Sequence, residues 1–163
     1  MLADGLATQP HREQSGPLAV DVQTEIDINR PRPDVSAYAT DPDHAPHWYE
    51  NIQSVEWVTP KPVAVGSRVQ FRARFLGRTL IYTYEVKELV AGERFIQATA
   101  EGPFPMETTY TWRDSPTGGT TMTLRNRGEP SGFSALVAPM MTVAMRRANR
   151  KDLLRLKAIL EKD

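Results

Sequence analysis

The chain has 163 residues, of which 40% are hydrophobic, and its 20 basic side chains balance 20 acidic ones. This length allows one domain with a hydrophobic core, and the balanced charge gives no field that would attract nucleic acid. The chain has no cysteine, which excludes disulfide bridges and thiolate chemistry and fits a reducing compartment. No apolar stretch is long enough to span a bilayer. We therefore expect a cytoplasmic protein with no nucleic-acid partner and no stable membrane insertion.

The N-terminal segment has neither the charge pattern of a secretory signal nor any apolar periodicity. Its mixture of polar residues, glycine and proline cannot bury enough apolar surface to offset the entropy lost on ordering. We predict a disordered tail over residues 1–16 and a single domain over residues 17–163.

The first predicted strand is followed by two short helices. Apolar or β-branched residues occupy every even position over residues 18–28, a period of two that indicates a strand with one buried face. Two prolines just after it end the strand. Residues 34–40 read as a short helix, and Asp41 with Pro42 reads as the N-cap and first turn of a second one.

Six further strands are predicted, separated by glycine-rich or proline-rich turns. The connections are short, with a tight hairpin at Gly77 and another at Gly92. Short connections of this kind are typical of an antiparallel meander rather than of βαβ units. The predicted strands cover residues 52–58, 68–75, 79–89, 94–100, 107–112 and 120–127.

A long helix is predicted at the C-terminus, where apolar residues recur at intervals of three and four. Over residues 133–145 they surround the helix almost completely, whereas only a stripe remains from Arg146 onward. Pro139 predicts a helix start or a kink. The many basic residues after position 145 read as a solvated face that complements the helix dipole, with contact to a membrane surface as the alternative.

Short sequence phrases accompany this order of elements, at residues 28–38, 40–42, 48, 65–68, 84–86, 91–95, 118–120 and 152–161. Together they resemble the SRPBCC, or START-like, superfamily of polyketide cyclase/dehydrase and lipid-transport proteins. The resemblance covers residues 18–163 and implies an α+β helix-grip fold like that of the birch pollen allergen. In this fold a curved seven-stranded antiparallel sheet wraps around a long C-terminal helix, in the order β-α-α-β6-α, and encloses a cavity.

Strand alternation and helix periodicity identify the side chains expected to point inward. Methionines facing aromatic rings suit a wall that adapts to different ligands. Composition alone favours the alternative that they fill a solid core, whereas the family resemblance favours a cavity. The predicted ligand-binding residues are Trp48, Phe71, Phe75, Tyr82, Tyr84, Gln97, Tyr110, Trp112, Met122, Leu124, Asn126, Leu136, Met140, Met141 and Met145.

Polar groups in the inward registers are candidates for orienting a ligand. Gln97, Thr99, Thr108 and Asn126 offer hydrogen bonds to a ligand carbonyl or hydroxyl, although each also has the option of bonding backbone or water. The inward tyrosine hydroxyls are candidates for polarising a carbonyl, but satisfied core tyrosines are more common.

Cofactor and covalent chemistry have no supporting motif, so no cofactor is predicted. His44 and His47 lie three positions apart near Asp41, but no distant third ligand is evident, and a capped helix start accounts for them better than a metal site. A cyclase needs an ionisable group inside the cavity. The nearest acid and base by sequence, Glu107 and Arg74, fall on the outward register.

Three functions follow from the sequence. The first is binding of a small hydrophobic ligand, such as a lipid, polyketide or isoprenoid, by a monomer or homodimer. The second is a polyketide cyclase or aromatase that uses acid/base catalysis in the same cavity. The third is a protein-interaction module of the co-chaperone type. The sequence leaves the ligand and any catalytic residue unidentified.

Overall fold

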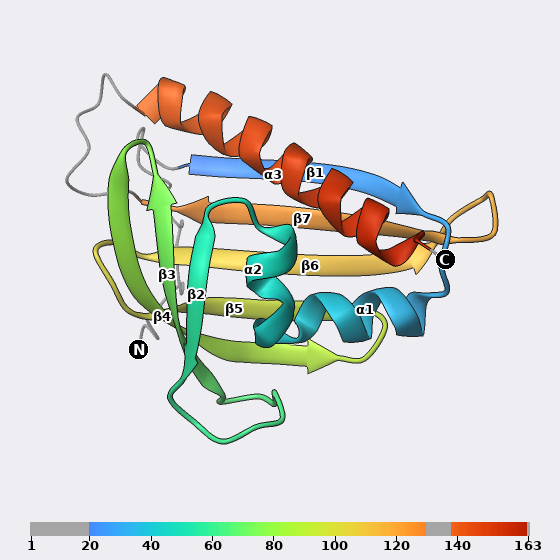
Figure 1. Ribbon diagram of the computed structural model, residues 1–163, viewed down its shortest axis with the longest axis horizontal. Helices are drawn as coiled ribbons and strands as arrows, with labels where there is room; N and C mark the ends of the chain where they lie inside the picture. The colour runs from blue at the N-terminus through green and yellow to red at the C-terminus, as the bar shows by residue number, and fades with distance from the viewer. Residues whose placement is uncertain (1–19, 130–137, 163) are drawn as a thin grey trace, which may run out of the picture.

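The computed structural model describes residues 20–129 and 138–162 and contains one curled antiparallel sheet with a long helix across its inner face (Figure 1). The seven strands follow the order β1-β7-β6-β5-β4-β3-β2. The elements are β1 Val20–Ile28, α1 Arg32–Thr40, the 3₁₀ helix η1 Pro42–His44, α2 Ala45–Trp48, β2 Ile52–Trp57, β3 Arg68–Phe75, β4 Arg78–Val90, β5 Arg94–Glu101, β6 Met106–Asp114, β7 Thr120–Gly128 and α3 Ala138–Leu160.

The predicted order of elements and fold class are confirmed, with small shifts at element ends. Helix α1 begins at Arg32, two residues earlier than predicted, because Pro33 is tolerated in a first turn where its missing N–H has no partner to lose. The predicted cap is confirmed, since the Asp41 side chain accepts the backbone N–H of Asp43 at 3.0 Å. The predicted tail over residues 1–16 lies outside the described residues.

The sheet is closed on one side by β1, which pairs with β7 in an unbroken register from Val20 opposite Gly128 to Ile28 opposite Thr120. Helix α3 lies along these strands (Figure 1). On the far side, the β3–β4 hairpin turns through Leu76 and Gly77, both at positive φ (48° and 75°). Two residues with positive φ give a tight turn that matches the twist of the strands it connects.

Strand β4 bends the sheet. Its pairing with β5 shifts register between Thr83 and Tyr84 and again between Val86 and Glu88. Irregularities of this kind bend a strand and increase its twist. Strands β2, β3 and β4 therefore turn away from the plane of β5–β7 and form a wall of their own (Figure 1).

The two halves of α3 have different surroundings. Leu153 and Leu156, in the C-terminal half, are fully buried in a core cluster with α1, α2 and the strands β4–β7. In the N-terminal half, Met141 is buried against β1, and Met145 packs against the same cluster. The solid core therefore lies under one half of α3, and the other half is available to bound a cavity.

Candidate functional site

A cavity of about 150 Å³ lies between the bent half of the sheet and the N-terminal half of α3. A single water needs only ~10–15 Å³ measured in the same way, so the space accepts a small organic molecule. Most of the accessible lining is apolar. The cavity is partly open to solvent, and Pro103 and Phe104 of the β5–β6 connection contribute to its partly exposed rim.

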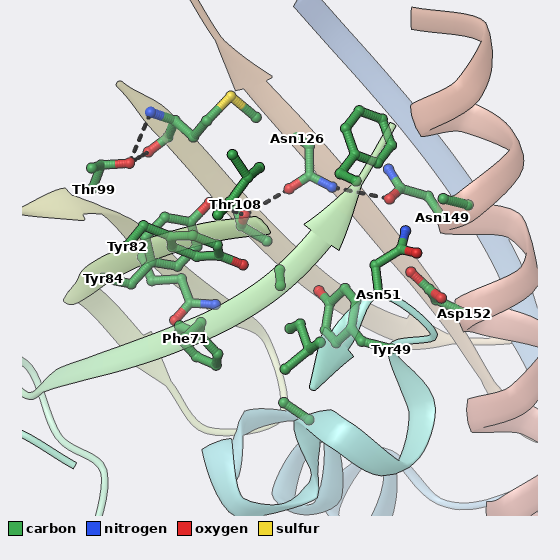
Figure 2. Close-up of a pocket in the computed structure, with 18 of the residues that line it drawn as sticks. Tyr49, Asn51, Phe71, Tyr82, Tyr84, Thr99, Thr108, Asn126, Asn149 and Asp152 are labelled. Carbon is green, nitrogen blue, oxygen red and sulfur yellow. Dashed lines mark hydrogen bonds between the residues drawn. The ribbon is translucent and has the colours of Figure 1, made fainter. Parts of the chain in front are cut away.

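Three aromatic rings form the sheet side of the cavity (Figure 2). Phe71 of β3 lies opposite Tyr82 of β4, and the strand register stacks their rings with centroids 5.6 Å apart. Tyr84, two residues along the same face, has its ring 4.9 Å from Tyr82 and 5.8 Å from Phe71. Rings held by adjacent strands form a stiff apolar surface with little conformational freedom to lose on binding.

A row of polar side chains crosses the inner face of the sheet. Gln97 of β5 lies opposite Thr108 of β6, which lies opposite Asn126 of β7. We call Gln97, Thr108 and Asn126 the polar row. Beyond it along the strands, Phe95 and Tyr110 still line the cavity, whereas Trp112, Met122 and Leu124 belong to the solid core.

Hydrogen bonds run from Tyr84 through the polar row to α3 (Figure 2). The Thr108 hydroxyl donates to Asn126 Oδ1 at 2.6 Å, so the Tyr84 hydroxyl, 3.2 Å from Thr108 Oγ1, must donate to it. Asn126 Nδ2 in turn donates to Asn149 Oδ1 on α3 at 3.2 Å. Asn149 Nδ2 is buried and has no partner among the described atoms.

Asp152 is an ionisable group buried in the cavity wall. Its residue surface is only 2% exposed, and burial raises the pKa of its carboxyl to about 7. The backbone N–H of Glu50 donates to Asp152 Oδ1 at 3.0 Å, which opposes the rise in pKa but does not cancel it. Asp152 therefore changes its charge near neutral pH.

Tyr49 lies beside Asp152 (Figure 2) and is paired with Tyr110. The hydroxyls of Tyr49 and Tyr110 share a short hydrogen bond, and burial raises the pKa of both well above the usual value for tyrosine. Burial also raises the pKa of Tyr84 to about 12. All three hydroxyls remain protonated at neutral pH and act as hydrogen-bonding groups rather than as bases.

The structure brings most of the predicted ligand-binding residues together around the cavity, although no ligand contact is observed for any of them. Thr99 and Thr108, two of the predicted orienting groups, also line it. Thr99 is already paired, since its hydroxyl bonds the backbone N–H and C=O of Met106 at 3.0 and 3.2 Å. The predicted residues that line the cavity are Phe71, Phe75, Tyr82, Tyr84, Gln97, Tyr110, Asn126, Met141 and Met145.

Five of the remaining predicted residues do not line the cavity. Trp112, Met122 and Leu124 point to the inner face but lie under the C-terminal half of α3, where Leu153 and neighbouring residues fill the space. Trp48 is fully buried in the same core.

Met140 is the fifth, because it is 68% exposed on the outer side of α3. Apolar residues surround this part of the helix in the sequence, so their pattern does not fix its rotation. Leu136 lies outside the described residues.

Sequence reasoning missed several polar residues of the site, among them Tyr49, Asn149 and Asp152. The basic residues around Asp152 predict a solvated face for it, and Asn149 is not among the residues that the sequence singles out. Their spacing from Met141 and Met145 carried the relevant signal, since positions 141, 145, 149 and 152 follow the intervals of three and four that define one helix face. Tyr49 had no such signal, because it follows a four-residue helix.

Local surroundings account for the residue considered above for metal binding, His44, and for those considered for catalysis, Glu107 and Arg74. The His44 ring stacks on Tyr38 with centroids 4.0 Å apart, and its Nδ1 lies 3.1 Å from the Tyr38 carbonyl oxygen. Glu107 pairs with Arg127 at 2.9 Å on the outer face, and Arg74 is exposed. The outward orientation expected for Glu107 and Arg74 is thus observed.

Comparison with known families agrees with this architecture. The family described as polyketide cyclase/dehydrase and lipid transport matches residues 19–161. The chain belongs to this family. The resemblance seen in the sequence phrases is thereby confirmed, and the family description covers both catalytic and carrier proteins. A search of curated proteins found no match, and no helix in the described residues is long and apolar enough to cross a membrane.

Solved structures share the fold at low sequence identity. The protein TTHA0849 from Thermus thermophilus aligns with a TM-score of 0.74 and 21% identity, covering 86% of this chain and 96% of that one. The Zhui aromatase/cyclase from a Streptomyces species aligns with a TM-score of 0.74, 13% identity and coverage of 88% and 94%. A START superfamily protein from Mycobacterium smegmatis aligns with a TM-score of 0.73 and 12% identity, covering 86% of this chain and 97% of that one. These similarities establish a START-like helix-grip fold.

Proposed function

We propose that this protein binds a small, mainly apolar molecule in the cavity between the bent sheet and α3. The observation that carries the proposal is a mainly apolar space, walled by Phe71, Tyr82 and Tyr84, that is crossed by a row of hydrogen-bonding side chains. An apolar pocket with a few placed polar groups is the usual form of a small-molecule site. Membership of a family that includes lipid-transport proteins supports the same conclusion.

The two walls suit this role in different ways. The aromatic wall is fixed by strand pairing, whereas Met141 and Met145 on α3 are unbranched and adapt their shape to a ligand. A rigid surface opposite a deformable one accepts apolar bodies of several shapes, while the polar row restricts how they are oriented.

The test is thermal unfolding of the purified protein with a panel of small hydrophobic molecules. A ligand that binds only the folded chain at one hundred times its Kd adds about 2.7 kcal/mol, which corresponds to a rise in Tm of roughly 5–10 °C for a chain of this size. No rise with any compound across a broad panel would refute the proposal.

Two variants of α3 locate the binding. Ala148 lines the cavity, whereas Ala144, one turn earlier on the same helix, does not. Ala148→Leu fills part of the space and is expected to abolish the ligand-induced rise in Tm. Ala144→Leu is the matched control and is expected to retain it. Equal loss in both variants would place the binding elsewhere.

A second candidate function, cyclisation of a polyketide-like substrate, is favoured by Asp152. A carboxyl with a pKa of about 7 beside the cavity is suited to exchange a proton with a bound carbonyl compound, and the Tyr49–Tyr110 pair supplies neutral hydroxyls nearby. Turnover of a poly-β-keto substrate would demonstrate the activity. Asp152→Asn, which keeps an oxygen for the Glu50 N–H, should abolish turnover while the ligand-induced rise in Tm remains. Unchanged turnover would exclude Asp152 as the acid or base.

A further inference from the structure

Gln97 is a buried amide whose hydrogen-bonding groups are unused. Gln97 lines the cavity, and only 8% of its surface is exposed. Its side chain forms no hydrogen bond with the described residues. Buried polar side chains almost always have a partner. The amide atoms of Gln97 are not sealed inside protein, because the fully enclosed, unpartnered side-chain atoms among the described residues belong to Trp48, Trp112 and Asn149. The unused groups of Gln97 therefore face the cavity.

None of the described neighbours of Gln97 forms the missing hydrogen bonds. Thr108, directly opposite on β6, has its only proton committed to Asn126. The amide of Asn126 is engaged with Thr108 on one side and Asn149 on the other. The hydroxyl of Tyr82, in the aromatic wall of the cavity, also has no hydrogen-bond partner within residues 20–129 and 138–162. Gln97 and Tyr82 thus remain available to a molecule in the cavity.

The charges around the cavity restrict that molecule further. Among the described residues that line it there is no lysine, arginine or histidine, and the ionisable acids are Asp41 and Asp152. A carboxylate or phosphate in this space would be removed from water without a counter-ion, at a large cost in free energy. Anionic lipids and ionised fatty acids are therefore poor ligands.

We propose that Gln97 is the specificity-determining residue of the cavity, and that the ligand is an uncharged molecule presenting an acceptor and a donor side by side at one end. A primary carboxamide and the enol form of a β-diketone both have this arrangement, which complements the carbonyl oxygen and NH₂ group of Gln97. The apolar body of the ligand then extends from the polar row along Phe71 and Tyr84. This inference rests on the proposed binding function.

The experiment compares four probes that share one apolar body, using isothermal titration calorimetry at pH 8. They are 2-naphthamide, with donor and acceptor; 2-acetylnaphthalene, with an acceptor only; 2-ethylnaphthalene, with neither; and 2-naphthoate, which is anionic at this pH. We expect 2-naphthamide to bind about tenfold more tightly than 2-ethylnaphthalene, with 2-acetylnaphthalene between them and 2-naphthoate at least tenfold weaker than the amide.

Two substitutions of glutamine by methionine assign the preference to a residue. Gln97→Met keeps the unbranched shape but removes the amide, and should reduce the preference for 2-naphthamide over 2-ethylnaphthalene to about one. Gln70→Met makes the same change on β3 at a position that does not line the cavity, and should leave the preference intact.

Each outcome separates the two proposals. Binding of all four probes with equal affinity, or tightest binding of 2-naphthoate, would overturn the inference while leaving the binding function standing. A preference for the amide that survives in Gln97→Met would remove Gln97 from its role. Failure of every probe to bind, together with no stabilisation by the wider panel, would overturn the binding function itself. The ranking in the unmodified protein remains decisive if Gln97→Met does not fold.

Discussion

The carboxyl of Asp152 on α3 accepts the backbone N–H of Glu50, which follows α2, at 3.0 Å. This bond connects the long helix to the segment that leads into β2. Because the carboxyl is buried in the cavity wall, its protonation is coupled both to folding and to whatever the cavity contains.

The stability of the protein should therefore depend on pH through Asp152. The pKa of this carboxyl is about 7 in the folded chain, against 3.8 for an aspartate side chain in water. Between these values the folded chain keeps a proton that the unfolded chain has lost, so the free energy of unfolding falls as pH rises from 4 to 7 and then levels off. A difference of about three pKa units corresponds to about 4 kcal/mol.

Urea denaturation of the protein and of Asp152→Asn between pH 4 and 8 measures this effect. The asparagine carries no such proton, so the variant should gain stability relative to the unmodified protein by up to about 4 kcal/mol over this range. Parallel stability curves for the two proteins would show that the carboxyl titrates normally in the fold.

The Tyr84–Thr108–Asn126 chain predicts unequal costs for removing its members. Thr108→Val leaves Asn126 Oδ1 without its donor and Tyr84 without its acceptor, and should lower the free energy of unfolding by about 1–3 kcal/mol. Tyr84→Phe removes one incoming bond and should lower it by about 1 kcal/mol. The double variant should lose less than the sum, because both substitutions break the same bond. Strict additivity in urea denaturation would contradict the shared bond.

The stability costs of truncating Met122 and Met145 should differ, because one lies in the solid core and the other in the cavity wall. Met122 is fully buried among core residues, and Met122→Ala should lower the free energy of unfolding by about 2–5 kcal/mol. Met145 is partly buried at an existing space, and Met145→Ala should cost less than about 2 kcal/mol while admitting bulkier ligands. Chemical denaturation and ligand titration measure both effects, and the reverse order of costs would contradict the division of the interior.

Gly119 lies where the start of β7 meets the end of β1. A Cβ at this position would overlap the carbonyl oxygen of Ile28, so Gly119→Ala should force the strands apart and cost about 3 kcal/mol. Gly92→Ala is a control with open space around the new carbon but a positive φ of 73°, and should cost about 1 kcal/mol. Similar losses of unfolding free energy in the two variants would show that a small shift of the strands relieves the close approach at Gly119.

The fold was predictable because the alternation of residues within each strand indicates which side chains face inward. Alternation placed Phe71, Tyr84 and Gln97 on the inner face without knowledge of any partner strand. It could not distinguish Trp112 from Thr108, which share that face, since the difference depends on which half of α3 lies opposite. The position of a residue along its strand distinguishes core from cavity only when the placement of α3 is known.

The polar residues of α3 were the harder case. Asp152 has basic neighbours in sequence, and a charged residue in such a run is usually solvated. Its burial arises because α3 presents that side to the segment around Tyr49, which is brought there by two short helices and their turns. Information of this kind is held in tertiary packing rather than in any local pattern.

The arrangement of β5, β6 and β7 separates two tasks within the same strands. One end of each strand supplies the packed block beneath Leu153 and Leu156, and the other end supplies the surface that a guest molecule would touch. Substitutions at the guest end remove no side chain from that block, so this scaffold can acquire new chemical preferences by small steps.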